Sequence, residues 1–313
     1  MKYFTIIFSV IISLIFLELF SRIFISDGMN YEIEMAKYAN NLKIVSQNKM
    51  IGIEHRKNIS VKLMGAQILL DDHGFRVDRK TKKNKNKKKI LMLGDSMTFG
   101  WGAKKPFPNI LNEKIENYEV LNAGIGNTNT IMQINNFFEN FSSKFEYELI
   151  VLNFFINDFE DIQIIKPNPL QKYSYLYTYM NNKINTILIK FNLKNDWEKF
   201  YTENYLNENI RNNTLKEIKK LYDYCNKKNI KFMIHNIPEL RDLNDYRFNN
   251  ETNIIKNFAK EEKIYFIDSF NSLKNYNEED LWVTNLDPHA NDYAHKIIAD
   301  FLLKKISKIF SLN

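Results

Sequence analysis

The feature that most constrains the fold of this chain is a regular alternation, after residue 88, of short apolar runs with longer amphipathic stretches. The strongest run, residues 146–155, is typical of a strand buried on both faces. Strands that alternate with helices predict a parallel sheet covered by helices on both faces. The expected strands span residues 89–93, 119–121, 146–155, 230–235 and 264–267, and the expected helices span residues 107–118, 130–141, 209–226, 252–260 and 293–309.

Two regions do not follow this alternation. Residues 26–78 have mixed periodicity and predict an irregular or small β-containing stalk. Residues 160–204 contain Pro167, Pro169 and a tyrosine cluster, and they predict an inserted, helical segment. We therefore expect a transmembrane anchor at residues 1–25, a stalk or linker with a basic run at residues 26–88, and an α/β domain at residues 89–313.

The anchor is expected from the amino-terminal residues. Residues 3–17 are uncharged and largely apolar, and the apolar character continues to Ile25 past Glu18 and Arg22. About 20 residues suffice to span the hydrocarbon layer. A cleaved secretion signal usually ends in small residues, and none follow here, so the sequence favours an uncleaved single-pass anchor. Too few charges flank the segment for the positive-inside rule to assign its orientation.

The formal charge of +7 is concentrated in one place. Eight basic residues and no acidic one lie between Arg79 and Lys89, and without them the charge is −1. This run has no interleaved aromatic residues and no recognition module, so we expect a solvated linker rather than a nucleic-acid site. Contact with anionic membrane lipids is the functional alternative.

The sequence gives no indication of a cofactor or a metal. The single cysteine, Cys225, excludes an intramolecular disulfide framework and a cysteine-rich metal site. No histidine–carboxylate spacing suggests a metal, and Gly100 and Gly102 resemble neither a dinucleotide loop nor a P-loop. His235 and His295 are expected to be structural, and Phe99 and Trp101 to shape a pocket or belong to the core.

Polar residues and glycines gather where the expected strands end. Because ligands bind at the carboxyl ends of parallel strands, these residues are candidates for a site. They supply a hydroxyl, glycine-rich backbone, a carboxamide and a carboxylate–imidazole pair, which are the parts of an acyl-transfer site. They are Gly94-Asp95-Ser96, residues 122–127, Asn157-Asp158 and Asp287-Pro288-His289.

These four blocks, in this order, resemble those of the SGNH/GDSL hydrolase superfamily. The resemblance covers roughly residues 88–312 and rests on four segments: ILMLGDS (residues 90–96), VLNAGIGN (residues 120–127), Asn157-Asp158 and DPHAN (residues 287–291). It implies a flavodoxin-like three-layer α/β/α sandwich. It also implies a serine hydrolase that cleaves ester bonds through an acyl-enzyme and needs no cofactor.

The resemblance assigns a role to each block. Ser96 is implied as the nucleophile, His289 as the general base and Asp287 as the group that orients the imidazole. The oxyanion would be held by the backbone N–H of Ser96, a backbone N–H of the second block and the side-chain amide of Asn157. Many relatives have a glycine where Asn127 falls, so Gly126 and Asn127 are both candidates. Many also have Asp-x-x-His, whereas here the carboxylate lies two residues before the histidine.

Several alternatives stay open at this point. Relatives with an anchor are similar to envelope proteins that remove or transfer acyl groups, which implies an acylated small-molecule, glycan or lipid substrate and an extracytoplasmic domain. An O-acetyltransferase of envelope glycans shares the acyl-enzyme step. A non-catalytic envelope scaffold on the same fold is the alternative from another class, in which Ser96, Asn157 and the Asp287–His289 pair would act as helix caps or turns.

Overall fold

A five-stranded parallel sheet forms the centre of the molecule in the computed structural model, which describes residues 2–78, 87–161, 168–194 and 196–311. The strands lie in the order β7-β6-β8-β9-β10, and all neighbours are parallel. In chain order this is 2-1-3-4-5, the flavodoxin-like arrangement. The strands are β6 (Lys89–Leu93), β7 (Glu119–Asn122), β8 (Tyr147–Phe154), β9 (Lys231–Asn236) and β10 (Tyr265–Asp268).

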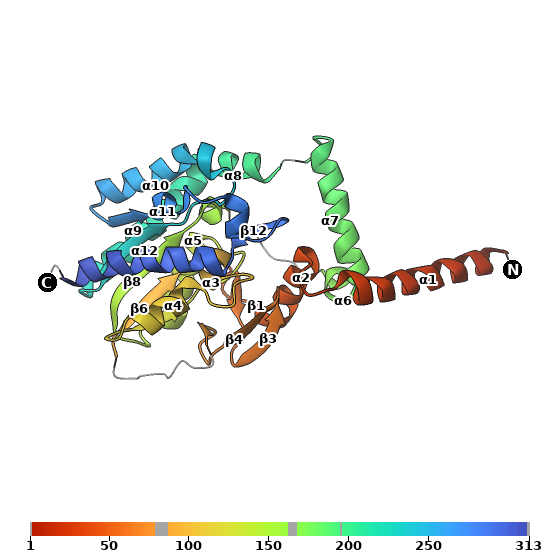
Figure 1. The fold of residues 1–313 in the computed structure, drawn as a ribbon, viewed down its shortest axis with the longest axis horizontal. Helices are drawn as coiled ribbons and strands as arrows, with labels where there is room; N and C mark the ends of the chain where they lie inside the picture. Colours follow the sequence, from red (N-terminus) through yellow and green to blue (C-terminus); the bar gives the residue numbers. More distant parts are fainter. Residues whose placement is uncertain (1, 79–86, 162–167, 195, 312–313) are drawn as a thin grey trace.

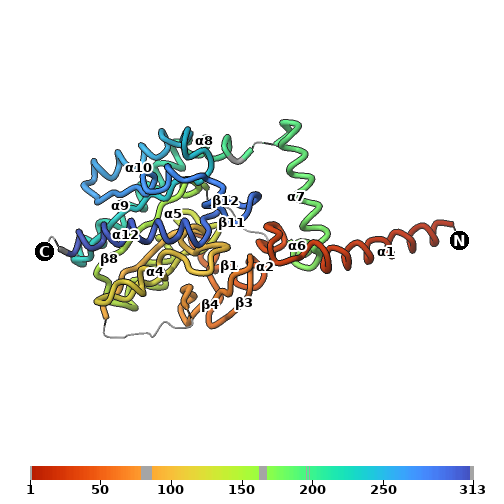
Figure 2. Tube along the Cα trace, in the orientation of Figure 1, coloured from red at the N-terminus to blue at the C-terminus, as the bar shows by residue number. Residues whose placement is uncertain are grey.

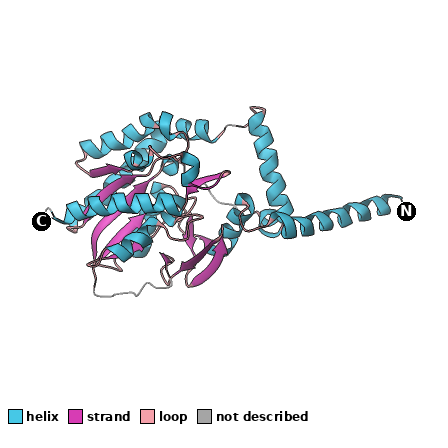
Figure 3. Cartoon of the chain, in the orientation of Figure 1, coloured by secondary structure: helices cyan, strands magenta, loops and turns pink. Residues whose placement is uncertain are grey.

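Helices cover both faces of the sheet, which confirms the predicted three-layer sandwich (Figure 3). Helix α4 packs against α12, and α5 packs against α9. The chief helices are α4 (Phe107–Lys114), α5 (Thr130–Asn136), α9 (Glu208–Lys227), α10 (Asn249–Glu261) and α12 (Asp292–Ser311). The shorter elements of this domain are α3 (Ser96–Phe99), η2 (Phe137–Phe141), η3 (Ile156–Phe159), η4 (Leu243–Asp245), α11 (Phe270–Leu273), η5 (Glu278–Leu281), β11 (Trp282–Thr284) and β12 (Asp287–Ala290).

The sequence pattern located these elements because it reflects burial. In β6 all five residues are buried, and in β8 all but Glu148 are, as expected for central strands. The helix expected at residues 107–118 ends earlier, at Lys114, because Ile115 adopts an extended conformation with φ −99° and ψ 101°. The helix expected at residues 130–141 is present, and its last five residues form a π-helical turn.

The amino terminus forms one long apolar helix, α1 (Lys2–Phe20), continued by the π-helical turn η1 (Ser21–Ile25). Together they comprise 24 residues, and their most apolar 18-residue window has a mean hydropathy of 2.4. At 1.5 Å per residue this is about 36 Å, enough to cross the hydrocarbon layer. Length and composition would equally suit a signal sequence. The helix extends away from the rest of the protein (Figure 1).

Residues 26–78 fold onto the α/β domain instead of forming a separate stalk. They contain α2 (Tyr31–Leu42) and two small antiparallel sheets, the first of which pairs β1 (Lys43–Val45) with β2 (Ile53–His55). The second contains β3 (Ile59–Leu63), β4 (Ala66–Leu70) and β5 (Arg76–Val77). Tyr38 and Leu42 share one hydrophobic cluster with Phe99 and Trp101 of the domain.

A buried arginine strengthens this attachment. The guanidinium of Arg76 donates to the carbonyls of Phe99 (3.0 Å), Gly100 (2.5 Å) and Ala103 (2.6 Å). Charge-assisted hydrogen bonds of this kind are among the stronger ones in proteins. Residues 26–78 therefore hold residues 99–103, in the loop after strand β6. The amino-terminal segment and the α/β domain thus form one folded body.

The structure describes only parts of the basic run and of the insertion. Residues 79–86 lie outside the described residues, but Lys88 pairs with Glu148 at 2.9 Å and Lys89 with Glu119 at 2.8 Å, so the end of the run belongs to the sheet. The insertion is helical as predicted, with α6 (Pro169–Tyr173), α7 (Tyr175–Lys190) and α8 (Trp197–Leu206). Pro167 lies outside the described residues.

Candidate active site

The first strand delivers Ser96 through a turn that requires glycine. A side chain at Gly94 would place its Cβ 2.1 Å from the hydroxyl of Thr98, far inside contact distance. Asp95 then caps helix α3, because its carboxylate accepts the backbone N–H of Met97 at 2.9 Å. Ser96 is therefore the first residue of a short helix at the carboxyl end of strand β6, and 9% of its surface is exposed.

A chain of hydrogen bonds joins Ser96 to Asp287. The hydroxyl of Ser96 lies 2.9 Å from Nε2 of His289, and Nδ1 of His289 lies 2.6 Å from Oδ1 of Asp287. The second oxygen of this fully buried carboxylate accepts the indole N–H of Trp101 at 2.9 Å. The structure thus brings Ser96, His289 and Asp287 together, although Ser96 and His289 are 193 positions apart in the chain.

The short Asp-x-His spacing is explained by strand β12 (Asp287–Ala290). In an extended strand, residues two apart point to the same side, so both side chains face the same way without a longer loop. Trp101, expected either as pocket or as core, is buried and fixes the far oxygen of Asp287. The indole thereby leaves one carboxylate oxygen for the imidazole.

Asp287 also determines the protonation of His289. Burial alone would lower the pKa of His289, but the hydrogen bond that His289 donates to Asp287, together with the charge of this carboxylate, outweighs burial and raises the pKa above its usual 6.5. The carboxylate accepts the proton on Nδ1, which leaves Nε2 with its lone pair toward the hydroxyl of Ser96. This is the tautomer that a general base requires.

Asn157 lies beside the same turn. Its side-chain amide donates to Oδ2 of Asp95 at 3.0 Å, and the same oxygen lies 3.4 Å from the hydroxyl of Ser96. Burial raises the pKa of Asp95, although the N–H of Met97 and the amide of Asn157 act against this. The turn after strand β8 thus places the carboxamide of Asn157 next to Ser96, as the sequence predicted. One N–H of this amide donates a hydrogen bond to Asp95.

The second block approaches Ser96 through Gly126, but the N–H of this glycine is already engaged. A Cβ at Gly126 would lie 3.4 Å from Cβ of Ser96, and its backbone N–H donates to the hydroxyl of Tyr38 at 2.9 Å. The N–H of Asn127 donates to no other described residue. Asn127 has a φ of 60°, in the left-handed region that favours glycine and, among other residues, asparagine.

Tyr38 belongs to a buried relay that starts in the amino-terminal segment. Burial lowers the pKa of His55 to about 3, so the ring is neutral. Nδ1 of His55 donates to the carbonyl of Gly74 at 3.1 Å, and Nε2 therefore accepts the hydroxyl proton of Tyr38 at 2.7 Å. The oxygen of Tyr38 is left to accept from Gly126, so every member of the relay has its partner.

Two further residues of the segment reach the same loop and the imidazole. The ammonium of Lys43 donates to the side chain of Asn127 at 2.7 Å and lies 4.1 Å from the ring centre of Tyr38. Burial lowers the pKa of Lys43 to about 7. The ring of Tyr31 stacks on His289 with centroids 6.2 Å apart. The segment expected as a stalk is therefore one wall of the site.

Sequence reasoning missed these residues, and no motif marks them. It also missed Glu239, which follows strand β9, is 3% exposed and pairs with Arg241 at 2.7 Å. Its charge adds to the causes that raise the pKa of His289. Glu239 could have been found by the rule applied to the other strand ends, because it follows the fourth strand by three residues.

The two other candidate histidines are structural, as expected. His235 is buried between the side chains of Asn153 (2.9 Å) and Ser269 (3.2 Å). His295 is buried on α12 and accepts the backbone N–H of Phe107 at 3.2 Å. Over the described residues, no group of three or more His, Cys, Asp or Glu side chains is placed to hold a metal ion.

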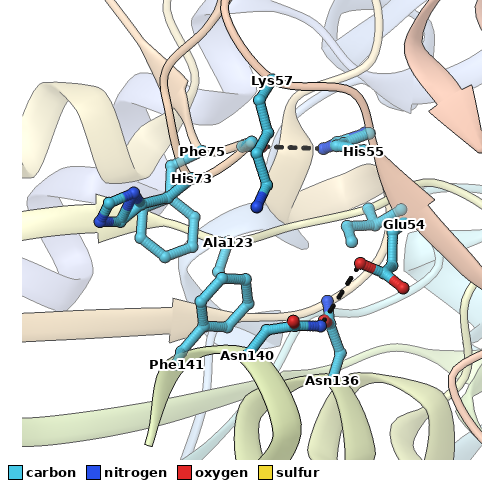
Figure 4. Close-up of a pocket in the computed structure, with 11 residues that line it drawn as sticks. Glu54, His55, Lys57, His73, Phe75, Ala123, Asn136, Asn140 and Phe141 are labelled. Atoms are coloured by element: carbon cyan, nitrogen blue, oxygen red, sulfur yellow. Dashed lines mark hydrogen bonds between the residues drawn. The ribbon is translucent and has the colours of Figure 1, made fainter. Parts of the chain in front are cut away.

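The contact between the segment and the domain is closely packed. A cavity of about 10 Å³, roughly the space of one water, lies between His55 and Phe75 on one side and Ala123 and Asn140 on the other (Figure 4). Asn140 donates across this contact to Glu54 at 3.4 Å. A second surface hollow, beside Tyr222 and Lys231, lies where strand β9 begins, at the edge of the sheet away from Ser96.

Comparison with known proteins gives similar solved structures only, since no protein-family model and no curated protein sequence matches the chain. An acetyl xylan esterase, AlAXEase, is 17% identical with a TM-score of 0.45, and the match covers 70% of this chain and 99% of that one. A lipolytic protein of the G-D-S-L family from Veillonella parvula is 18% identical with a TM-score of 0.43, over 69% and 97%. A mutant of the acetyl-xylooligosaccharide esterase Axe2 from Geobacillus stearothermophilus is 14% identical with a TM-score of 0.47, over 71% and 96%.

The relay through Tyr38 predicts a specific loss of stability. Tyr38→Phe would leave the N–H of Gly126 and Nε2 of His55 buried without a partner, and we expect the free energy of unfolding to fall by about 1–3 kcal/mol. Tyr31→Phe is the matched control, because the hydroxyl of Tyr31 makes no hydrogen bond with another described residue. Denaturant unfolding of both variants measures the difference. Equal stability of the two would contradict the relay.

Proposed function

We propose that this chain is a membrane-anchored serine hydrolase of the SGNH/GDSL type that cleaves ester bonds. The observation that carries the proposal is the unbroken hydrogen-bond chain from the hydroxyl of Ser96 through His289 to Asp287. A serine hydroxyl is a weak nucleophile until a base within hydrogen-bond reach accepts its proton, and the 2.9 Å separation from Nε2 satisfies this requirement.

The proposed reaction has two halves. As Oγ of Ser96 attacks the ester carbonyl carbon, its proton moves to Nε2 of His289, and Asp287 stabilises the imidazolium that forms. The tetrahedral intermediate collapses, the proton passes to the departing alcohol, and the acyl group stays on Ser96. Water then gives a proton to His289 and attacks the acyl carbon, which releases the acid and restores the serine hydroxyl.

For the oxyanion we propose the backbone N–H groups of Ser96 and Asn127 together with the side-chain amide of Asn157. Gly126 is the weaker second-block candidate because its N–H donates to Tyr38. Asn127 has the positive φ that explains a glycine at this position in relatives, and its side chain is held by Lys43. Losing one donor of this kind typically costs about 10²–10³ in rate.

The anchor is the remaining part of the proposal. Helix α1 with η1 has the length and hydropathy of a membrane span, and 6% of its most apolar window is buried in the protein. A largely exposed apolar helix is costly in water, which supports lipid as its surroundings. An acylated envelope glycan or lipid as substrate, and an extracytoplasmic site, remain the expectations drawn from the resemblance.

A fluorophosphonate probe tests the proposed chemistry directly, because it forms a bond only with an activated serine. We expect the full-length chain in detergent to be labelled, and the labelling to disappear in Ser96→Ala. Ser60→Ala, a change of an exposed strand serine outside the site, is the control and should label as the unchanged chain does. A folded chain that is not labelled, or a Ser96→Ala variant that still is, would overturn the proposal.

The raised pKa of His289 predicts the pH dependence of ester cleavage. His289 accepts a proton only when neutral, so kcat/KM should rise with pH through a midpoint above 6.5. Asp287→Asn removes the hydrogen-bonded charge that raises this pKa, so the midpoint should move to lower pH while kcat falls by about 10⁴.

The variant Glu239→Gln is compared with Asp287→Asn in the same pH profile of kcat/KM. Glu239 also raises the pKa of His289 but is the last and smallest of the causes, so the midpoint should move less and in the same direction. Hydrolysis of an activated ester across the pH range gives all three profiles. A midpoint that is unchanged in Asp287→Asn would contradict the role assigned to this carboxylate.

A further inference from the structure

Helix α7 (Tyr175–Lys190) carries an exposed apolar stripe that the catalytic proposal does not use. Met180, Ile184, Ile187 and the following Phe191 are 47%, 51%, 53% and 69% exposed. Their spacing of four, three and four residues places them on one face of the helix. Thr178 is 3% exposed and lies about 160° around the helix from Met180, so the stripe points away from the protein body.

We propose that this stripe is a second membrane contact, in which α7 lies along the lipid surface with its apolar face at the boundary of headgroups and acyl chains. The inference rests on the membrane anchoring of α1 proposed above and is independent of the ester chemistry. Amphipathic helices bind in this way when they combine an apolar face with basic residues.

The first support is that α7 begins at the end of the anchor. The carboxylate of Glu18 accepts the hydroxyl of Ser174 (2.7 Å) and the backbone N–H groups of Tyr175 (3.1 Å) and Leu176 (3.0 Å), so it caps the helix. Arg22, paired with Glu18 at 2.7 Å, donates to the carbonyl of Tyr173 at 2.7 Å. Glu18 and Arg22 are two of the three charged residues in residues 2–25, the third being Lys2 at the opposite end, and charged residues of a membrane span belong at its interfaces.

The second support is direction. Helix α1 extends along the long axis of the molecule, and α7 leaves its inner end across that axis (Figure 1, Figure 2). If α1 crosses the membrane, α7 therefore extends roughly along the membrane surface. A helix fixed at the interface by Glu18 and Arg22 and oriented in this way has the apolar stripe within reach of lipid.

Composition gives the third support. The described segment from Pro169 to Lys194 contains four lysines and no acidic residue, which favours anionic lipid headgroups. They are Lys172, Lys183, Lys190 and Lys194. Four tyrosines lie at the start of α7 and just before it, where the helix joins the anchor, and tyrosine is enriched at membrane–water interfaces. In this proposal the tyrosine cluster of the predicted insertion lies at the membrane–water interface.

The contact would also place the catalytic site. Helix α7 packs on α2, and α2 carries Tyr31 and Tyr38, which touch His289 and the loop at Gly126. Helices α7 and α2 therefore connect the proposed lipid contact to the residues around Ser96. A chain that contacts the membrane through both α1 and α7 holds Ser96 at a fixed position relative to the membrane, which suits an ester presented at the membrane surface.

Fluorescence quenching tests the inference on the full chain. Single cysteines at Ile184, Ile187 and Thr186 would carry an environment-sensitive dye, with the chain in vesicles of phosphatidylethanolamine and phosphatidylglycerol that contain a doxyl-labelled lipid. Thr186 is the matched control, since it is exposed on the same helix but lies about 160° around from Ile184. The native Cys225 is buried and should stay unlabelled. A cysteine at Ser13 in α1 reports the anchor.

We expect quenching at Ile184→Cys and Ile187→Cys to exceed that at Thr186→Cys by at least about twofold, as for a helix that buries one face in the interface. Equal quenching at the three positions, with Ser13→Cys quenched, would overturn the inference and leave the anchor standing. A dye at position 184 that is shielded from water but not quenched would mean that a protein covers the stripe, which also overturns it. Absent quenching at Ser13→Cys would remove the anchor and this inference together, without bearing on fluorophosphonate labelling.

Discussion

The site depends on one geometric constraint, which is that neighbouring parallel strands end at the same edge of the sheet. Strands β6, β7 and β8 therefore deliver Ser96, the loop at Gly126 and Asn157 to one place, although 61 residues separate the first of these from the last. The imidazole arrives differently, on the short hairpin of β11 and β12. Because β12 is extended, Asp287 and His289 share a face and meet the serine as a pair.

The amino-terminal segment forms one wall of the site at this edge. Its contribution is made of buried polar contacts: Tyr38 with Gly126, Lys43 with Asn127, and Arg76 with the carbonyls after Ser96. A buried polar group costs free energy unless it is paired, so these contacts are specific as well as stabilising. The same segment follows directly on the apolar helix α1 and the turn η1 in the chain.

The sequence predicted the parts of the fold that follow from local periodicity. The five strands and the long helices are within a few residues of their expected positions, and the largest shortening is in α4, which ends at Lys114 instead of residue 118. Ser96, Asp287, His289 and Asn157 were predicted because they follow strands or precede the last helix. Tyr31, Tyr38 and Lys43 were not. Tyr31 and Tyr38 lie on helix α2 and Lys43 lies on the three-residue strand β1, and none of them follows a strand of the central sheet. Tyr38 also meets Gly126 across 88 positions. Local patterns hold no information on such pairing.

The central claim is that Ser96 carries the acyl group during turnover. It is tested most directly by mixing the full-length chain with an activated acetyl ester, quenching with acid within the first turnover, and locating the acetyl group by peptide mass spectrometry. The account predicts one acetyl group per chain, on the peptide that contains Ser96, and none in Ser96→Ala. Acetylation at another residue, or none on a folded chain that still cleaves the ester, would contradict it.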